Sequence, residues 1–80
     1  KAFDPEFIIY PNPGNDEFVV QGLRTGDELR LVDLMGREVY RTRIANEVYR
    51  FHCPGLSEGI YAVQIKTRNT LASSKLLIQR

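Results

Sequence analysis

The sequence predicts an all-β domain, built as an antiparallel sandwich of about seven short strands. Apolar residues recur with a period of two in most segments and with a helical period in almost none, which is typical of strands with one buried face. Turn-forming residues recur about every 8–12 residues, and this spacing favours an immunoglobulin- or fibronectin III-like fold. With 80 residues, of which 42% are hydrophobic and 26% charged, the chain is long enough for one small globular domain.

The first expected strand, Phe7–Tyr10, ends where proline appears. Pro11 and Pro13 have no backbone N–H to donate to a sheet, and Pro13 followed by glycine fits a type II turn over residues 12–15. A second short strand is expected over Phe18–Val20. The chain is therefore expected to turn tightly between these two strands.

A third strand is expected over Glu28–Leu34, with its leucines at positions 29 and 31 facing the core. A tight hairpin at Met35–Gly36, with Gly36 in the left-handed region, joins it to the next strand. Asp33 is placed to accept hydrogen bonds from the amides of that turn.

The second half alternates in the same way. Residues 49–53 predict a strand with Tyr49, Phe51 and Cys53 on the core face, followed by a corner at residues 54–59. The longest clean strand begins near Tyr61 and turns near residues 68–69, and a last strand runs through residues 76–78. Leu56, Gly59 and Tyr61 resemble a tyrosine corner, in which the phenol bonds back to the backbone.

The predicted core includes Leu29, Leu31, Val39, Phe51, Val63 and Ile65, with Cys53 buried and slow to react.

Composition argues against several classes of function. The net charge of +1 gives no reason to expect nucleic acid as a partner, and the longest apolar runs are too short for membrane insertion. The chain begins with Lys1 rather than methionine, which suggests a piece of a longer protein. Residues 1–7 are expected to be the end of a linker from an upstream cargo domain, and residues 8–80 the folded domain.

No catalytic group can be assembled from the residue types present. His52 and Cys53 are neighbours on a strand, so their side chains point to opposite faces and cannot form a nucleophilic pair. One histidine and one cysteine cannot supply a zinc site, so no metal and no cofactor are expected, and calcium at Asp16, Glu17 and Asp27 lacks the usual ligand spacing. A basic group is expected to form cross-strand ion pairs on a solvent-facing sheet. Its members are Arg37, Arg41, Arg43 and Arg50.

Four pieces in a fixed order carry a family resemblance: Tyr10-Pro11-Asn12-Pro13, Asp33-x-x-Gly36-Arg37, Gly59-x-Tyr61, and Lys75-Leu76 followed by aliphatic residues. In this order and spacing they resemble the C-terminal sorting domain of the type IX secretion system, the Por secretion tail. The resemblance implies a non-enzymatic export signal recognised by the outer-membrane secretion machinery, with a sortase-like cysteine peptidase acting in trans. It implies secretion or cell-surface attachment of the cargo through the periplasm of a Gram-negative bacterium. The implied recognition candidates are Pro11, Asn12, Pro13, Asp33, Gly36, Arg37, Gly59, Tyr61, Lys75 and Leu76.

Two other functions remain open. A sandwich of this size could be a carbohydrate-binding or adhesion module, for which an exposed aromatic platform is the distinguishing feature. It could also be a tail that packs on an upstream catalytic domain and regulates it.

Overall fold

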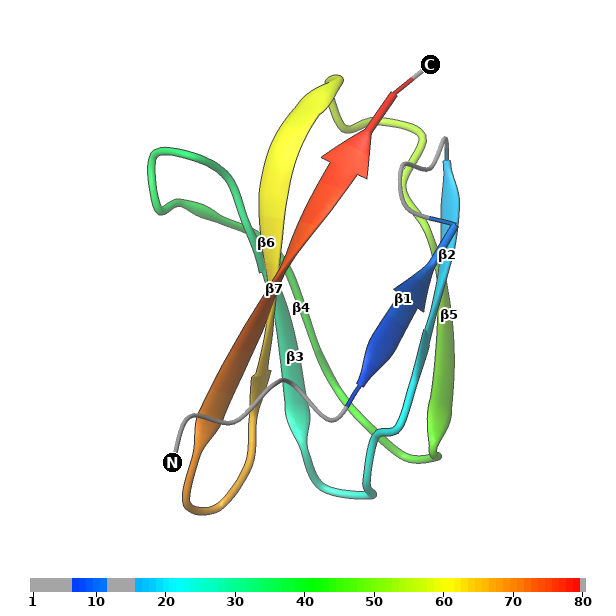
Figure 1. The fold of residues 1–80 in the computed structure, drawn as a ribbon, viewed down its shortest axis with the longest axis vertical. Helices are drawn as coiled ribbons and strands as arrows, with labels where there is room; N and C mark the ends of the chain where they lie inside the picture. The colour runs from blue at the N-terminus through cyan, green and yellow to red at the C-terminus, as the bar shows by residue number, and fades with distance from the viewer. Residues whose placement is uncertain (1–6, 12–15, 80) are drawn as a thin grey trace.

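The chain folds into two antiparallel sheets packed face to face, as the computed structural model shows for residues 7–11 and 16–79 (Figure 1). The predicted all-β class is confirmed, and the described residues contain no helix. The strands are β1 Ile8–Tyr10, β2 Glu17–Gln21, β3 Glu28–Val32, β4 Glu38–Arg43, β5 Val48–His52, β6 Gly59–Lys66 and β7 Leu71–Ile78.

One sheet has three strands in the order β1-β2-β5, and the other has four in the order β4-β3-β6-β7. Every pairing is antiparallel. Because β4 pairs with β3 while β5 pairs with β2, the chain crosses between the sheets, as sandwiches of the immunoglobulin and fibronectin III type do. The two longest strands, β6 and β7, form the side of the second sheet that ends with the C-terminal strand.

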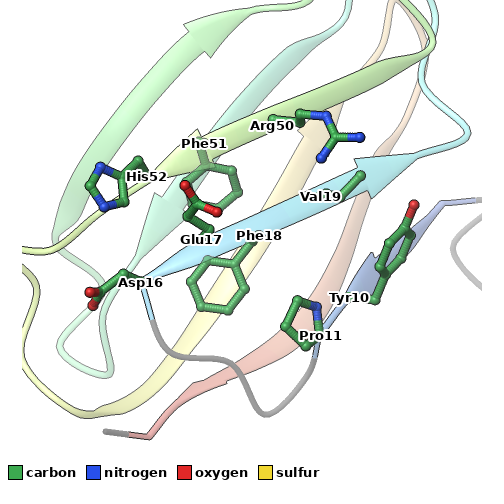
Figure 2. A pocket seen from close by; sticks show the side chains of 9 residues that line it. All are labelled: Tyr10, Pro11, Asp16, Glu17, Phe18, Val19, Arg50, Phe51 and His52. Carbon is green, nitrogen blue, oxygen red and sulfur yellow. The ribbon is translucent and has the colours of Figure 1, made fainter.

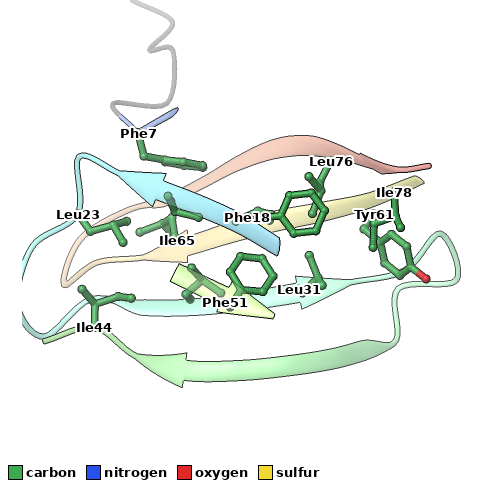
Figure 3. Packing of buried hydrophobic residues seen from close by; sticks show 13 residues of the cluster. Phe7, Phe18, Leu23, Leu31, Ile44, Phe51, Tyr61, Ile65, Leu76 and Ile78 are labelled. Carbon is green, nitrogen blue, oxygen red and sulfur yellow. The ribbon is translucent and has the colours of Figure 1, made fainter. Parts of the chain in front are cut away.

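A single apolar cluster fills the space between the sheets (Figure 3). Phe18 of β2 lies against Phe51 of β5, with ring centroids 5.4 Å apart. Cys53 was predicted to be buried but is half-buried, because it follows the end of β5, where its Sγ contacts the Asp16 carbonyl at 3.4 Å. Five of the six other predicted core residues are buried. The five are Leu29, Leu31, Phe51, Val63 and Ile65.

Val39 is the other exception, because it is only partly buried. An irregularity in the β3–β4 register places Tyr40 opposite Leu31 and Glu38 opposite Val32, so Val39 has no partner in the ladder. A bulge of this kind interrupts the strict alternation of inward and outward side chains. Tyr40 therefore takes the inward position that alternation assigned to Val39.

The loops at one end of the sandwich also contribute to the core. Leu23 and Ile44 lie outside the strands, yet both are almost fully buried. Backbone hydrogen bonds join their loops, from the Gly26 amide to the Ile44 carbonyl and from the Ile44 amide to the Asp27 carbonyl, each at 2.8 Å. The buried Asp27 carboxylate accepts a bond from the Arg24 amide at 3.1 Å.

Two of the differences between predicted and observed strand boundaries have a direct physical cause. The third strand ends at Val32 rather than Leu34, because Asp33 begins the turn. The last strand starts at Leu71, well before residue 76, because its small and polar residues pair with β6 without an apolar signal of their own. The turn predicted over residues 12–15 lies outside the described residues.

Candidate functional site

The hairpin between β3 and β4 is held by its first and last residues. Asp33 Oδ1 accepts hydrogen bonds from the amides of Met35 and Arg37, both at 2.9 Å. The Asp33 amide bonds to the Arg37 carbonyl and the Gly36 amide to the Asp33 carbonyl, again at 2.9 Å. Gly36 has φ of +81°, the left-handed conformation that the sequence predicted. The residues of the motif Asp33-x-x-Gly36-Arg37 therefore form a single hydrogen-bonded turn.

An ion pair forms within the same turn. The Arg37 Nε lies 3.2 Å from Asp33 Oδ2. The backbone hydrogen bond from Arg37, together with the Met35 amide and the Arg37 charge, lowers the pKa of Asp33 below its ordinary value of 3.8. Asp33 is thus fully ionised near neutral pH, and its charge is satisfied within the turn.

Gly59 and Tyr61 form the predicted tyrosine corner. The Tyr61 hydroxyl donates to the Ser57 carbonyl at 2.7 Å, four residues upstream, while its ring is buried. Gly59 begins β6 with φ of +150°, and an added Cβ would meet no atom within 4 Å. The glycine is required by its backbone conformation rather than by crowding. This motif therefore fixes the crossing into β6 and presents little of itself to solvent.

Lys75 and Leu76 lie side by side on β7 but face opposite ways. Leu76 pairs with Tyr61 and is completely buried, whereas Lys75 pairs with Ala62 and is exposed on the outer face. In the folded domain only Lys75 can be touched directly by another molecule.

Pro11 lies beside an open hollow next to β1, β2 and β5 (Figure 2). Its walls combine apolar and polar side chains, with Glu17 and His52 paired across β2 and β5 and Arg50 opposite Val19. Asn12 and Pro13, the other candidates from this motif, lie outside the described residues. The lining residues are Tyr10, Pro11, Asp16, Glu17, Phe18, Val19, Arg50, Phe51 and His52.

Of the four arginines in the basic group, Arg41 forms the cross-strand ion pair expected of a solvent-facing sheet, whereas Arg37 pairs with Asp33 inside its own turn and Arg50 lies on the other sheet. Arg41 Nη2 lies 2.8 Å from Glu38, and a second contact joins Arg41 to Glu28 at 3.7 Å. Arg30, opposite Arg41 in the ladder, reaches Glu38 at 3.6 Å and donates to the side-chain Oε1 of Gln64 at 2.7 Å. The hydrogen bond from Arg41 lowers the pKa of Glu38. The charges of Arg30 and Arg41 are therefore used within the sheet.

A pair of tyrosines, one from each sheet, connects the two sheets. The hydroxyls of Tyr40 and Tyr49 share a hydrogen bond, and both rings stack near Phe51. Burial, followed by the bond to Tyr49, raises the pKa of Tyr40 to about 12. Among the described residues Tyr10 is the only aromatic side chain that is largely exposed, so no platform of several aromatic rings is formed there.

No reactive constellation is assembled in the part of the chain that the structure describes. His52 is exposed on the outer face and Cys53 packs against the core, so the two are kept apart as strand geometry predicts. Within residues 7–11 and 16–79, no group of three or more potential metal ligands is found. The same residues include no helix that could cross a membrane.

Sequence reasoning placed Met35 in the turn but did not single out either of two adjacent residues at the hairpin tip as exposed apolar side chains. Leu34 was expected in a strand, but it is 75% exposed, and Met35 beside it is 90% exposed. The signal for their position was the turn chemistry of Asp33 and Gly36 on either side of them.

The fold and its stabilised turns define a small immunoglobulin-like β-sandwich module. The family model of the secretion system C-terminal sorting domain matches residues 8–79, so the chain belongs to this family of type IX secretion sorting domains. No curated protein shows a significant match.

Among solved structures, the chain is similar to PorZ of Porphyromonas gingivalis, described as an essential bacterial surface component of the type IX secretion system. The TM-score is 0.85 with 22% sequence identity, over 92% of this chain. The match spans only 11% of that protein, and at this identity the likeness shows the shared fold alone.

Proposed function

We propose that this domain is a non-catalytic address that carries an attached cargo protein across the outer membrane by type IX secretion and leads to its attachment at the cell surface. The observation that carries the proposal is the match of the sorting-domain family over residues 8–79. The expected partners are the outer-membrane secretion machinery, an upstream cargo domain, and a sortase-like cysteine peptidase that would perform the covalent chemistry. The cargo would fold and pass through the periplasm before export.

The last strand is proposed as part of the recognised surface. β7 forms one border of the four-stranded sheet and places Lys75 on the outer face. A residue in this position is accessible to a docking protein, whereas the neighbouring Leu76 supports the fold.

Fusing the chain to the C-terminus of a periplasmic reporter tests the proposal in a strain with type IX secretion. The intact fusion is expected in the medium or on the cell surface, and it is expected to stay in the periplasm of a strain without the secretion system. Retention of the intact fusion in both strains would refute the address function. A Lys75→Ala fusion that folds and is exported normally would remove Lys75 from the recognised surface.

A further inference from the structure

Phe7 belongs to the apolar core although it precedes the first strand. Its side chain is 6% exposed and packs in the cluster between the two sheets, one residue before β1 begins. Figure 3 places its ring at the end of the cluster that also holds Leu23 and Ile44, the two core residues supplied by loops. The core therefore includes a residue that lies N-terminal to the residues matched by the family model, which begin at residue 8.

The β1 strand has few other contacts with the core. It is three residues long, and in the part of the chain that the structure describes it pairs with β2 alone. Ile8 and Tyr10 face outward and are 59% and 41% exposed, while Ile9 on the inner face is only half-buried. Among residues 7–11, Phe7 is the one with a buried side chain. Because a short strand with few buried contacts opens easily, the attachment of β1 depends strongly on Phe7.

We infer that Phe7 anchors the junction between the domain and its cargo, so that a peptidase separating the two cuts the chain before Phe7 and not within β1. The folded unit then begins at Phe7, and the linker expected over residues 1–7 ends one residue earlier. This inference goes beyond the proposed address function, because it concerns where the domain can be separated from a protein joined to it.

The protection of β1 follows from what a peptidase must reach. Hydrolysis adds one water molecule across a peptide bond and leaves a carboxylate on the cargo side and an amine on the domain side. In a folded protein a paired and packed bond is cut from locally opened states, so the cutting rate follows their population. The bonds between Phe7 and Tyr10 are opened only when Phe7 leaves the core and β1 separates from β2.

The position of the cut also decides what remains of the domain. A cut after Phe7 removes its ring from the apolar cluster and leaves half-buried Ile9 as the inward side chain of β1. A cut before Phe7 leaves both the cluster and the β1–β2 pairing intact. The anchor therefore allows the cargo to be released from a domain that keeps its whole core.

Limited digestion of a fusion with a reporter joined to Lys1 tests the inference. Thermolysin is the probe, because it cuts before large apolar residues and is offered Phe7, Ile8 and Ile9 alike. The mass of the resistant fragment identifies its first residue. We expect the fragment from the intact fusion to begin at or before Phe7. A resistant fragment that begins at Ile8 or later would overturn the inference.

Two substitutions separate the anchor from its neighbour. Phe7→Ser removes the buried ring, whereas the control Ile8→Ser alters the adjacent side chain, which is 59% exposed. The rate of cutting before Ile9 is measured in both, since this bond is present in every variant. We expect it to rise by about tenfold or more in Phe7→Ser, and to stay within about twofold of the intact rate in Ile8→Ser. Equal rates in the two variants would show that Phe7 does not anchor β1.

The fragment left by Phe7→Ser tells how far the anchor acts. A fragment that lacks β1 but retains β2 to β7 identifies a local anchor of the first strand. Digestion of the whole Phe7→Ser domain, with Ile8→Ser still protected, equally shows that the folded unit begins at Phe7. Phe7→Leu should recover most of the protection, because leucine is also an apolar side chain that can fill the core. These digestions use purified fusions, so failure of export in a secreting strain would refute the address function and leave this inference standing.

Discussion

The β3–β4 hairpin and the tyrosine corner both depend on a glycine with positive φ, yet they face opposite environments. In the hairpin, Gly36 turns a solvated loop whose tip side chains point away from the core. In the corner, Gly59 leads directly to the buried ring of Tyr61. The two motifs are equally visible in the sequence, but only the first can present side chains to another protein. The burial of a side chain, rather than how clearly its motif stands out in the sequence, distinguishes residues that stabilise the fold from residues that another protein could contact.

This comparison predicts that substitutions near the corner reduce the stability of the domain, whereas substitutions of the exposed side chains at the hairpin tip leave its stability nearly unchanged. Export assays on corner variants must therefore be matched to folded protein levels.

Leu76→Ala should destabilise the domain strongly, because it removes a fully buried side chain opposite Tyr61. The expected loss in the free energy of unfolding is about 2–5 kcal/mol, measured by urea denaturation. Leu71→Ala on the same strand is the control, since Leu71 is largely exposed and should change stability by no more than about 0.5 kcal/mol. Equal effects of the two substitutions would show that β7 is not anchored through Leu76.

Gly36→Ala should cost about 1–2 kcal/mol, because alanine is strained at positive φ and no neighbouring atom would clash with its Cβ. Gly59→Ala should also destabilise the domain, since Gly59 has positive φ as well. Gly55→Ala is the control, because Gly55 lies in a turn without positive φ and with open space around it. Chemical denaturation of the three variants would contradict this account if Gly55→Ala were as costly as the others.

Tyr61→Phe removes the bond to the Ser57 carbonyl while keeping the ring in the core. The expected cost is about 0.5–1.5 kcal/mol, the usual net value of one hydrogen bond. Tyr10→Phe is a matched control, because its hydroxyl accepts an exposed bond from Gln21. A smaller cost for Tyr61→Phe than for Tyr10→Phe would mean that the corner bond adds nothing to stability.

The contrast also shows what the sequence could predict. The alternation of apolar and polar residues predicted the all-β class and the inward-facing residues Leu29, Leu31, Val63 and Ile65. It could do so because successive side chains of a strand point to opposite faces, one buried and one exposed to solvent. Local turn chemistry predicted the bonds of Asp33 and Tyr61, since each partner lies within four residues. Both kinds of signal are local.

Features that depend on distant pairing were missed. Ile44 is buried because its loop bonds to the loop of Asp27, and β7 is long because β6 pairs along its whole length. The bulge that turns Tyr40 inward leaves no mark in the sequence of β4 alone. The exposed position of Leu34 was missed for a related reason, because apolar character predicted a strand where Asp33 had already begun a turn.

The smallest expected effect concerns the charge of Asp33. Its pKa is lowered in the folded state, so its stabilising contribution is present above the ordinary value of 3.8 and is lost as pH falls through the folded value.

Asp33→Asn should leave global stability nearly unchanged, because the turn is exposed and an amide oxygen can still accept from the backbone. Amide exchange at Met35 and Arg37 should nevertheless become faster near neutral pH, since the bond to the Arg37 side chain is lost. In the unsubstituted domain the protection of these two amides should decrease as the pH falls below 3.8 towards the lowered pKa of Asp33, and in the Asn variant this pH dependence should disappear. Glu38→Gln is the control, because its carboxylate binds Arg41 and not the turn. Unchanged exchange at both amides in Asp33→Asn would show that the ionised carboxylate does not hold the hairpin tip in place.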